Sequence, residues 1–215
     1  MDSTRIIAVR HGETDWNAGG RIQGLSDIPL NDKGRWQAER AAQMLADSRE
    51  PIAAIYSSDL ARAHATASSI AHAYGIPVKT DLRLRERSFG DFEGLTFTEL
   101  EQAFPTDTTR WRARDPQWAP PGGETLVALG ERILAATHTL ARRHVGEQIV
   151  LVAHGGVLDM LYRFATRQSM DARRTWELGN ASINRLLWTP EGLHLVGWSD
   201  TRHLDAESRD AATPR

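Results

Sequence analysis

Two histidines in the sequence each follow a short apolar run and precede a glycine. His11 comes after the run 6–9 and Arg10, and His154 comes after the run 148–153. Runs rich in Ile and Val are typical of buried strands, and open α/β sheets bind ligands at the carboxyl ends of their strands. A neutral imidazole can attack phosphorus and split a difficult displacement into two easier ones. Two histidines and an arginine at one sheet edge therefore predict phosphoryl chemistry.

A phosphoryl group also needs cationic partners. Arg62 follows Ser58-Asp59-Leu60, and a helix that begins near Asp59 places Arg62 in its first turn, beside the positive end of the helix dipole. The planar guanidinium groups of Arg10 and Arg62 can each hold two phosphoryl oxygens. An isolated arginine on a helix is more often solvated, so Arg62 gains significance only from the histidines.

An alcohol that leaves from phosphate needs a proton, and a carboxyl group can supply it. Glu86, Asp91 and Glu93 lie within eight residues of one another. Charge density does not choose among them, because each could equally be a solvated surface group. His154 can hydrogen-bond the phosphoryl oxygens and stabilise the charge that accumulates on them.

The elements that must position these residues alternate between strand and helix. We expect strands over 4–9, 51–56 and 148–153, an extended or irregular stretch over 78–87, a terminal hairpin of 182–188 and 194–198, and helices over 32–45, 59–74, 96–104, 125–144, 156–166 and 171–178. This order predicts an α/β fold, a three-layer αβα sandwich with a mostly parallel central sheet and helices on both faces. We expect one domain over 1–204, a small lid at about 88–123 and a frayed tail over 205–215.

Composition narrows the class of protein. The chain has 215 residues, a net charge of −2 and no cysteine. No broad basic field attracts nucleic acid, and disulfides and thiolate metal sites are excluded. No apolar stretch is long enough to cross a bilayer, so we expect no membrane partner. The first five residues lack the pattern of a secretory signal, and we therefore expect a cytoplasmic protein.

Taken together, the motifs resemble those of the histidine phosphatase superfamily, which includes cofactor-dependent phosphoglycerate mutases and many phosphatases. The resemblance runs from Thr4 to about Trp198. Its motifs are Arg10-His11-Gly12-Glu13-Thr14, Trp16-Asn17, Arg21-Ile22-Gln23-Gly24, Ser58-Asp59-Leu60 with Arg62, Ala63 and Thr66, Glu86 with Gly90, Pro121-Gly122-Gly123-Glu124, and His154-Gly155-Gly156. All of them in order, in fitting strand-to-loop contexts, are far more specific than any one alone.

The resemblance implies a role for each matching residue. It implies that His11 is the nucleophile that becomes phosphorylated and that Glu86 is the proton donor. The implied phosphate pocket consists of Arg10, Arg62 and His154, the implied substrate contacts are Asn17, Gln23 and Gly24, and Gly155 offers backbone approach. Because arginines and histidines supply the positive charge, the resemblance implies neither a metal nor a cofactor.

A phosphoric monoester hydrolase of the histidine acid phosphatase type, acting on small phosphorylated metabolites, is the leading hypothesis. The segment 94–121 is shorter than the insertion that covers the site in the family's mutases, and the loop 18–24 looks more like the phosphatase branch. A cofactor-dependent phosphoglycerate mutase is the alternative. A catalytically silent phospho-ligand-binding protein ranks lower, because His11, Glu86 and His154 are all present. A fourth hypothesis is a metal-dependent hydrolase that uses His11, His154 and a carboxylate, and the arginines that crowd the site argue against a cation there.

Two features leave alternatives open. Trp111 and Trp118 lie in the expected lid among Arg110, Arg112 and Arg114, and they could shape a substrate pocket or pack the lid on itself. The terminal hairpin could present an edge strand for a homodimer.

Overall fold

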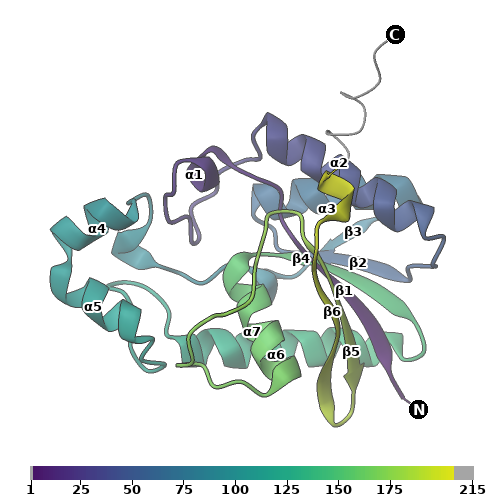
Figure 1. Cartoon of the computed structure of the whole chain (residues 1–215). Coiled ribbons are helices and arrows are strands. Elements are labelled where there is room, and N and C mark those ends of the chain that lie inside the picture. Colours follow the sequence, from purple (N-terminus) through teal and green to yellow (C-terminus); the bar gives the residue numbers. More distant parts are fainter. Residues whose placement is uncertain (1, 206–215) are drawn as a thin grey trace.

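The structure, a computed structural model, describes residues 2–205. Its centre is a six-stranded sheet (Figure 1) in the order β3-β2-β4-β1-β5-β6. The strands are β1 (Thr4–Arg10), β2 (Ala54–Ser57), β3 (Val78–Thr80), β4 (Gln148–Ala153), β5 (Ile183–Thr189) and β6 (Gly192–Asp200). β1 to β4 are mutually parallel, and β5 and β6 add an antiparallel hairpin beside β1. The mostly parallel sheet and the terminal hairpin agree with the prediction.

Helices cover both faces of this sheet. They are α1 (Asp15–Ala18), α2 (Asp32–Asp47), α3 (Ala61–Tyr74), α4 (Phe97–Ala103), α5 (Pro105–Ala113), α6 (Leu126–Ala141) and α7 (Gly155–Thr166). α2 and α3 pack on one face, and α6 and α7 pack on the other, while α4 and α5 lie beyond the end of the sheet (Figure 1). The predicted three-layer αβα sandwich is confirmed.

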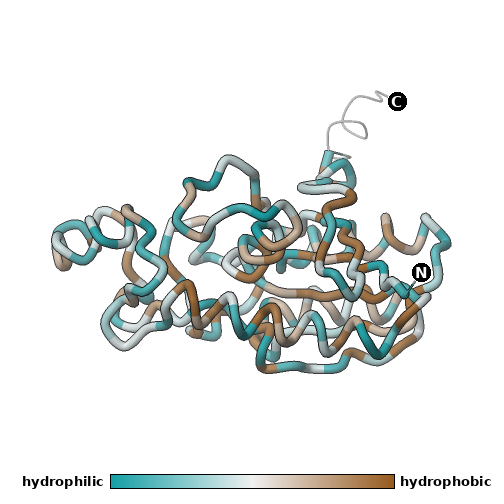
Figure 2. The backbone as a smooth tube through the Cα atoms, turned by 90° about the horizontal axis from the view of Figure 1, so that it is seen from below, coloured by the Kyte–Doolittle hydropathy of each residue, from teal (hydrophilic) through white to brown (hydrophobic). Residues whose placement is uncertain are grey.

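The alternation of side chains along β1 explains its continuous apolar run. Ile6 and Ala8 face α6 and α7, whereas Ile7 and Val9 face α2 and α3. Successive residues of a strand point to opposite faces, so a strand covered on both sides must be apolar throughout. Figure 2 shows brown hydrophobic segments running through the sheet region, with hydrophilic teal turns around it.

Local signals set several helix ends. Asn31 accepts a hydrogen bond from the backbone N–H of Gly34 at the start of α2, and Thr125 caps α6 in the same way. α3 ends at Gly75, whose φ of 66° is left-handed and favours glycine. The predicted start of α3 was two residues early. Its N-cap is Leu60, and Asp59 instead forms an ion pair with Arg85.

The predicted helix over 171–178 is wrong, because these residues form an irregular loop. The guanidinium of Arg163 donates to the backbone carbonyls of Ser169 and Ala172. Trp176 stacks on Tyr162 with ring centroids 4.1 Å apart. These contacts with α7 favour an irregular backbone over helical hydrogen bonds along 171–178.

The segment 88–123 has a small apolar core of its own, formed by Phe92, Leu100 and Trp118. The sequence shows no helical period over α5 because Thr108 is its one fully buried residue, and Pro105 stands at its first turn, where proline needs no N–H partner.

β6 is an edge strand of the sheet, and its side chains Leu195 and Val196 are exposed.

Within residues 2–205, no helix is both long and apolar enough to cross a membrane. Apart from Asp205, the predicted frayed tail lies outside the described residues.

Candidate active site

The register of two neighbouring parallel strands brings the two histidines together. Arg10 pairs with Ala153 across β1 and β4, so the residues that follow them, His11 and His154, leave the sheet side by side. The backbone N–H of His11 donates to the carbonyl of Ala153 at 3.0 Å. The two imidazole centroids are 5.2 Å apart. The predicted meeting of two histidines at one sheet edge is therefore what the structure contains.

A hydrogen bond defines the tautomer of His11. Its Nδ1 lies 2.7 Å from the carbonyl oxygen of Gly12, and a carbonyl can only accept, so Nδ1 carries the proton. Nε2 is then the ring nitrogen with a free lone pair. The backbone N–H of Gly12 donates to the Thr66 hydroxyl at 3.1 Å, which anchors this loop to α3.

Burial keeps both imidazoles neutral. His11 is 3% exposed and His154 is fully buried. Desolvation lowers the pKa of His11 well below its ordinary value, and the charges of Arg10 and Arg62 lower it further. The pKa of His154 is lowered in the same direction, again chiefly by burial. A neutral imidazole is the form that attacks phosphorus.

Arg10 and Arg62 are held against these rings by backbone carbonyls. Arg62 is fully buried, and its two terminal nitrogens donate to Ser26 and Gly24 carbonyls at 2.8 Å each. Arg10 donates to the carbonyl of Leu178. Burial lowers the pKa of Arg10 to about 10, and the nearby Glu86 carboxyl opposes that shift.

Four buried side-chain nitrogens of Arg10, Arg62 and His154 have no hydrogen-bond partner in the described part of the chain. They are Nε of Arg10, Nε of Arg62 and both ring nitrogens of His154. A buried polar group without a partner costs about 1–3 kcal/mol. A neutral imidazole has one N–H, so three of these four nitrogens can donate. Three such donors fit an anion with several acceptor oxygens, and a phosphoryl group has that chemistry.

Glu86 is the carboxylate that reaches this site. Both of its oxygens lie 3.0 Å from the backbone nitrogen of Gly156, at the start of α7, and Oε1 also accepts from the N–H of Arg87. A Cβ atom on Gly156 would lie 2.3 Å from Glu86 Oε1, so this approach requires glycine. Asp91 is exposed and Glu93 bonds elsewhere, which resolves the choice that charge density left open.

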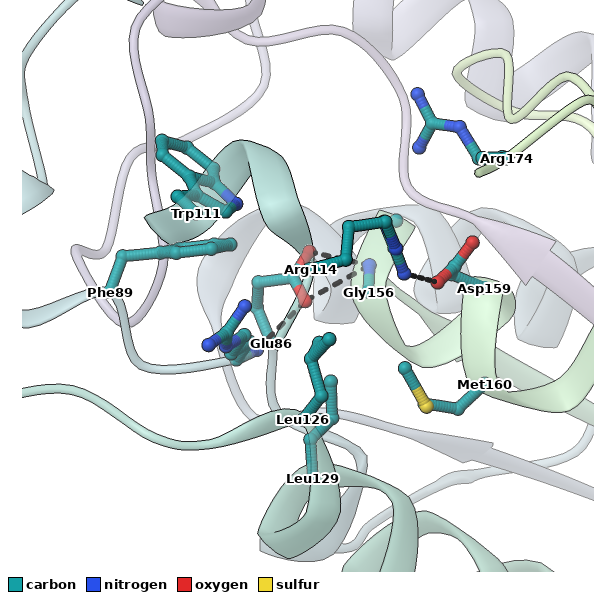
Figure 3. A pocket seen from close by; sticks show the side chains of 12 residues that line it. Glu86, Phe89, Trp111, Arg114, Leu126, Leu129, Gly156, Asp159, Met160 and Arg174 are labelled. Carbon is teal, nitrogen blue, oxygen red and sulfur yellow. Dashed lines mark hydrogen bonds and ion pairs between the residues drawn. The ribbon is translucent and has the colours of Figure 1, made fainter. Parts of the chain in front are cut away.

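A cavity of about 450 Å³ opens beside Glu86 (Figure 3). Among the residues that line it are Glu86, Phe89, Trp111, Arg114, Asp159 and Arg174. A second cavity of about 620 Å³ shares Gly155 and Arg174 with the first and reaches Arg10. The space beside Arg10 therefore adjoins the cavity beside Glu86, which has an aromatic wall of Phe89 and Trp111.

Comparison with known proteins places this site in a family. Residues 6–201 match the histidine phosphatase superfamily (branch 1). The chain belongs to that superfamily. It is 43% identical, over 75% of its length and 73% of the relative's, to a glucosyl-3-phosphoglycerate phosphatase of Mycolicibacterium vanbaalenii. It is 40% identical to phosphoglycerate mutase-like protein 4 of Arabidopsis thaliana, over 95% and 89% of the two chains.

A solved structure of the superfamily has the same fold. YhfR of Bacillus stearothermophilus superposes with a TM-score of 0.86 at 33% identity, covering 94% of this chain and 99% of that one.

The other residues that the superfamily resemblance singled out form a network around His11. Asn17 and Gln23 meet at Thr14, whose hydroxyl lies 3.1 Å from Asn17 Oδ1 and 2.9 Å from Gln23 Oε1. The amide of Asn180 donates to both the His11 carbonyl and Asn17 Oδ1. Sequence reasoning missed Asn180, which lies in a loop without a motif.

Glu93 has a structural task in this superfamily member. Its carboxylate accepts from the backbone N–H groups of Leu25 and Ser26 at 3.0 and 2.8 Å, and from Phe89 at 3.1 Å. These bonds shape the loop whose carbonyls hold Arg62. Gly24, at φ 55°, packs so closely on Glu93 that a Cβ there would lie 2.0 Å from its Oε1.

Arg132 and Glu124 support the Glu86 segment, and sequence reasoning assigned neither a task. Arg132 donates to the carbonyls of Arg83 and Arg85 at 2.7 and 2.9 Å, and Glu124 holds the same guanidinium through both of its oxygens. The Pro-Gly-Gly-Glu motif therefore contributes Glu124 to the backbone support of Glu86. A motif glutamate followed eight residues later by a helical arginine was the available signal.

Trp111 and Trp118 could each shape a substrate pocket or pack the lid on itself, and their surroundings differ. Trp118 is buried against Phe92 in the small core of segment 88–123. Trp111 packs on Phe89, with centroids 5.7 Å apart, and also lines the cavity. Within residues 2–205, no group of three or more His, Cys, Asp or Glu side chains could hold a metal ion.

Proposed function

We propose that this protein is a phosphomonoesterase that hydrolyses small phosphorylated metabolites through a phosphohistidine at His11. The observation that carries the proposal is the cluster of unpartnered buried nitrogens of Arg10, Arg62 and His154 around a neutral His11. The similarity to a glucosyl-3-phosphoglycerate phosphatase supports the same activity.

In the first step, Nε2 of His11 attacks phosphorus and the bond from phosphorus to the ester oxygen breaks. Glu86, protonated at this stage, gives its proton to the leaving oxygen, so that an alcohol departs. Arg10, Arg62 and His154 donate hydrogen bonds to the three remaining phosphoryl oxygens. Donors fixed in a buried site act strongly on charge that develops there.

In the second step, Glu86 takes a proton from water, and the oxygen of that water attacks phosphorus. The phosphorus–nitrogen bond breaks, inorganic phosphate leaves, and His11 regains its lone pair. Glu86 is again protonated, so the cycle closes without a metal or a cofactor. We assign Asn17, Gln23, Gly24 and Gly155 to substrate binding in this scheme.

Phosphate release from a panel of phosphomonoesters tests the proposal. The panel includes 3-phosphoglycerate, with and without a bisphosphoglycerate primer. We expect release of inorganic phosphate without a primer, and a ³²P-labelled, acid-labile, base-stable protein adduct on rapid quenching that His11→Ala abolishes. The relative named phosphoglycerate mutase-like favours a second candidate, a mutase. Primer-dependent interconversion of 3- and 2-phosphoglycerate with little free phosphate would establish it instead.

Three finer assignments belong to the same proposal. An acid-phosphatase type of activity requires a pH optimum below neutrality, which a rate profile measures. A homodimer through the β6 edge requires a molar mass near twice that of the chain in light scattering. A cytoplasmic location is tested by fractionation of cells that produce the full-length protein.

A further inference from the structure

Three guanidinium groups line the cavity beside Glu86, and two of them are already engaged. Arg87 donates to the Glu124 carbonyl at 2.7 Å. Arg114 donates to Asp159 at 3.1 Å and to the Met170 carbonyl at 3.2 Å (Figure 3). Arg174 is the third, and within residues 2–205 it has no hydrogen bond or ion pair to a protein group. It lies on the 167–179 loop (Figure 3) and lines both cavities.

Arg174 is exposed, and its positive charge lies near other cationic groups of the site. Its charge contributes to lowering the pKa of both Arg10 and Arg114, although burial is the larger cause for each. These like charges repel one another. An anion bound between these groups removes that repulsion.

Geometry tells which part of a substrate this anion belongs to. In the proposed reaction, the transferred phosphoryl group binds at His11, among Arg10, Arg62 and His154. Glu86, which protonates the leaving oxygen in the proposed reaction, lines the cavity of about 450 Å³, and its carboxyl interacts with the charge of Arg10. The cavity beyond Glu86 therefore receives the substituents of the leaving alcohol. Its volume is in the range that holds small metabolites.

We propose that Arg174 binds a second anionic group on the leaving alcohol, a carboxylate or a second phosphate, and so makes the enzyme selective for phosphomonoesters with that group. Phe89 and Trp111 form the wall that accommodates the rest of the alcohol. The inference rests on the proposed phosphomonoesterase activity. Arg174 acts on specificity and leaves the chemical step to His11 and Glu86.

Matched substrates test this inference. 3-Phosphoglycerate and glycerol 3-phosphate share a three-carbon skeleton, but the second has a hydroxymethyl group in place of the carboxylate. Fructose 1,6-bisphosphate and fructose 6-phosphate differ in a second phosphate. p-Nitrophenyl phosphate has no second anion. The variants are Arg174→Ala, Arg174→Lys and, as a matched control, Arg173→Ala, which alters a neighbouring exposed arginine outside the cavity lining.

In at least one pair, we expect the wild type to have the higher kcat/KM on the substrate that has a second anionic group. Arg174→Ala should remove roughly 10- to 100-fold of that preference, mainly through KM, in line with the loss of a charge-assisted contact. The preference of Arg174→Lys should lie between those of the wild type and Arg174→Ala. In both variants, turnover of p-nitrophenyl phosphate should change by less than about threefold. The pair that responds identifies the anion as carboxylate or phosphate.

Equal loss on all substrates would show that Arg174 binds the transferred phosphoryl group, and no loss on any would show that it is only solvated. Either result overturns the inference. It is also overturned if the wild type prefers neither 3-phosphoglycerate nor fructose 1,6-bisphosphate over its matched partner. Arg173→Ala should behave as the wild type, and a matching loss in it overturns the assignment to Arg174. Failure of the proposed function looks different, because His11→Ala would then retain turnover in the same assays.

Discussion

His11 and His154 are neighbours because the residues before them, Arg10 and Ala153, are paired across β1 and β4. Their rings lie 5.2 Å apart although 142 residues separate them in the chain. A shift of one residue in this register would turn one imidazole to the opposite face of the sheet. The site therefore depends on the same strand pairing that builds the core.

Replacing the proposed nucleophile separates chemistry from folding. We expect His11→Ala to lower kcat on every phosphomonoester by roughly 10³-fold or more, as is typical when a nucleophile is removed. The folded state should persist, because a neutral buried imidazole contributes no ion pair. His64→Ala, at an exposed position on α3, is the control and should keep full activity. Substantial turnover by His11→Ala would contradict the assignment.

The proton-donor assignment of Glu86 predicts a dependence on the leaving group. Glutamine keeps the shape of the side chain but cannot cycle a proton. Glu86→Gln should slow alkyl phosphates by about 10²- to 10⁴-fold, and p-nitrophenyl phosphate by less than about tenfold, because nitrophenolate leaves without a proton. Steady-state kinetics on both substrates measure the difference, with Glu39→Gln on the exposed side of α2 as control. An equal loss on both substrates argues against the assignment.

The buried histidines predict acid sensitivity of the fold. Folding holds the pKa of His11 and His154 below the ordinary value of 6.5. As the pH falls below 6.5, the unfolded chain binds protons that the folded protein excludes, so the free energy of unfolding decreases. The slope is at most about 1.4 kcal/mol per pH unit for each histidine. Above pH 6.5 both states are neutral, and this contribution is constant.

Denaturant titrations between pH 5 and 8 measure this slope. His11→Asn should flatten it, whereas His64→Asn should not, since His64 is exposed. An unchanged slope in His11→Asn would mean that His11 takes up its proton equally in both states.

The support of the Glu86 segment by Arg132 predicts a linked loss of stability and rate. Arg132→Ala leaves the carbonyls of Arg83 and Arg85 and the carboxylate of Glu124 without their donor. We expect a loss of about 1–3 kcal/mol in the free energy of unfolding. We also expect kcat on alkyl phosphates to fall more than kcat on p-nitrophenyl phosphate, as in Glu86→Gln.

Arg142→Ala, an exposed neighbour at the end of α6, is the control for Arg132. A purely structural role for Arg132 would lower both rates by the same factor, which distinguishes it from a role in positioning Glu86.

Local patterns in the sequence predicted most of the fold and much of the site. Two-sided burial makes β1 and β4 continuously apolar, so both strands and the histidines after them can be recognised without a structure. Capping and left-handed positions mark helix ends such as Asn31 and Gly75. The place of Arg62 in the first turn of α3 followed from the same signals, although the predicted start was two residues early.

Tertiary structure alone decided what depends on contacts between distant segments. Charge density leaves Glu86, Asp91 and Glu93 equivalent, and the family resemblance singles out Glu86 without a physical reason. The N-terminus of α7 supplies that reason by presenting the N–H of Gly156 to Glu86. The loop over 171–178 has a helical composition, yet Arg163 and the stacking of Trp176 hold it irregular. Periodicity reports burial and backbone preference, whereas the partner of a charged group depends on which segments the fold brings together.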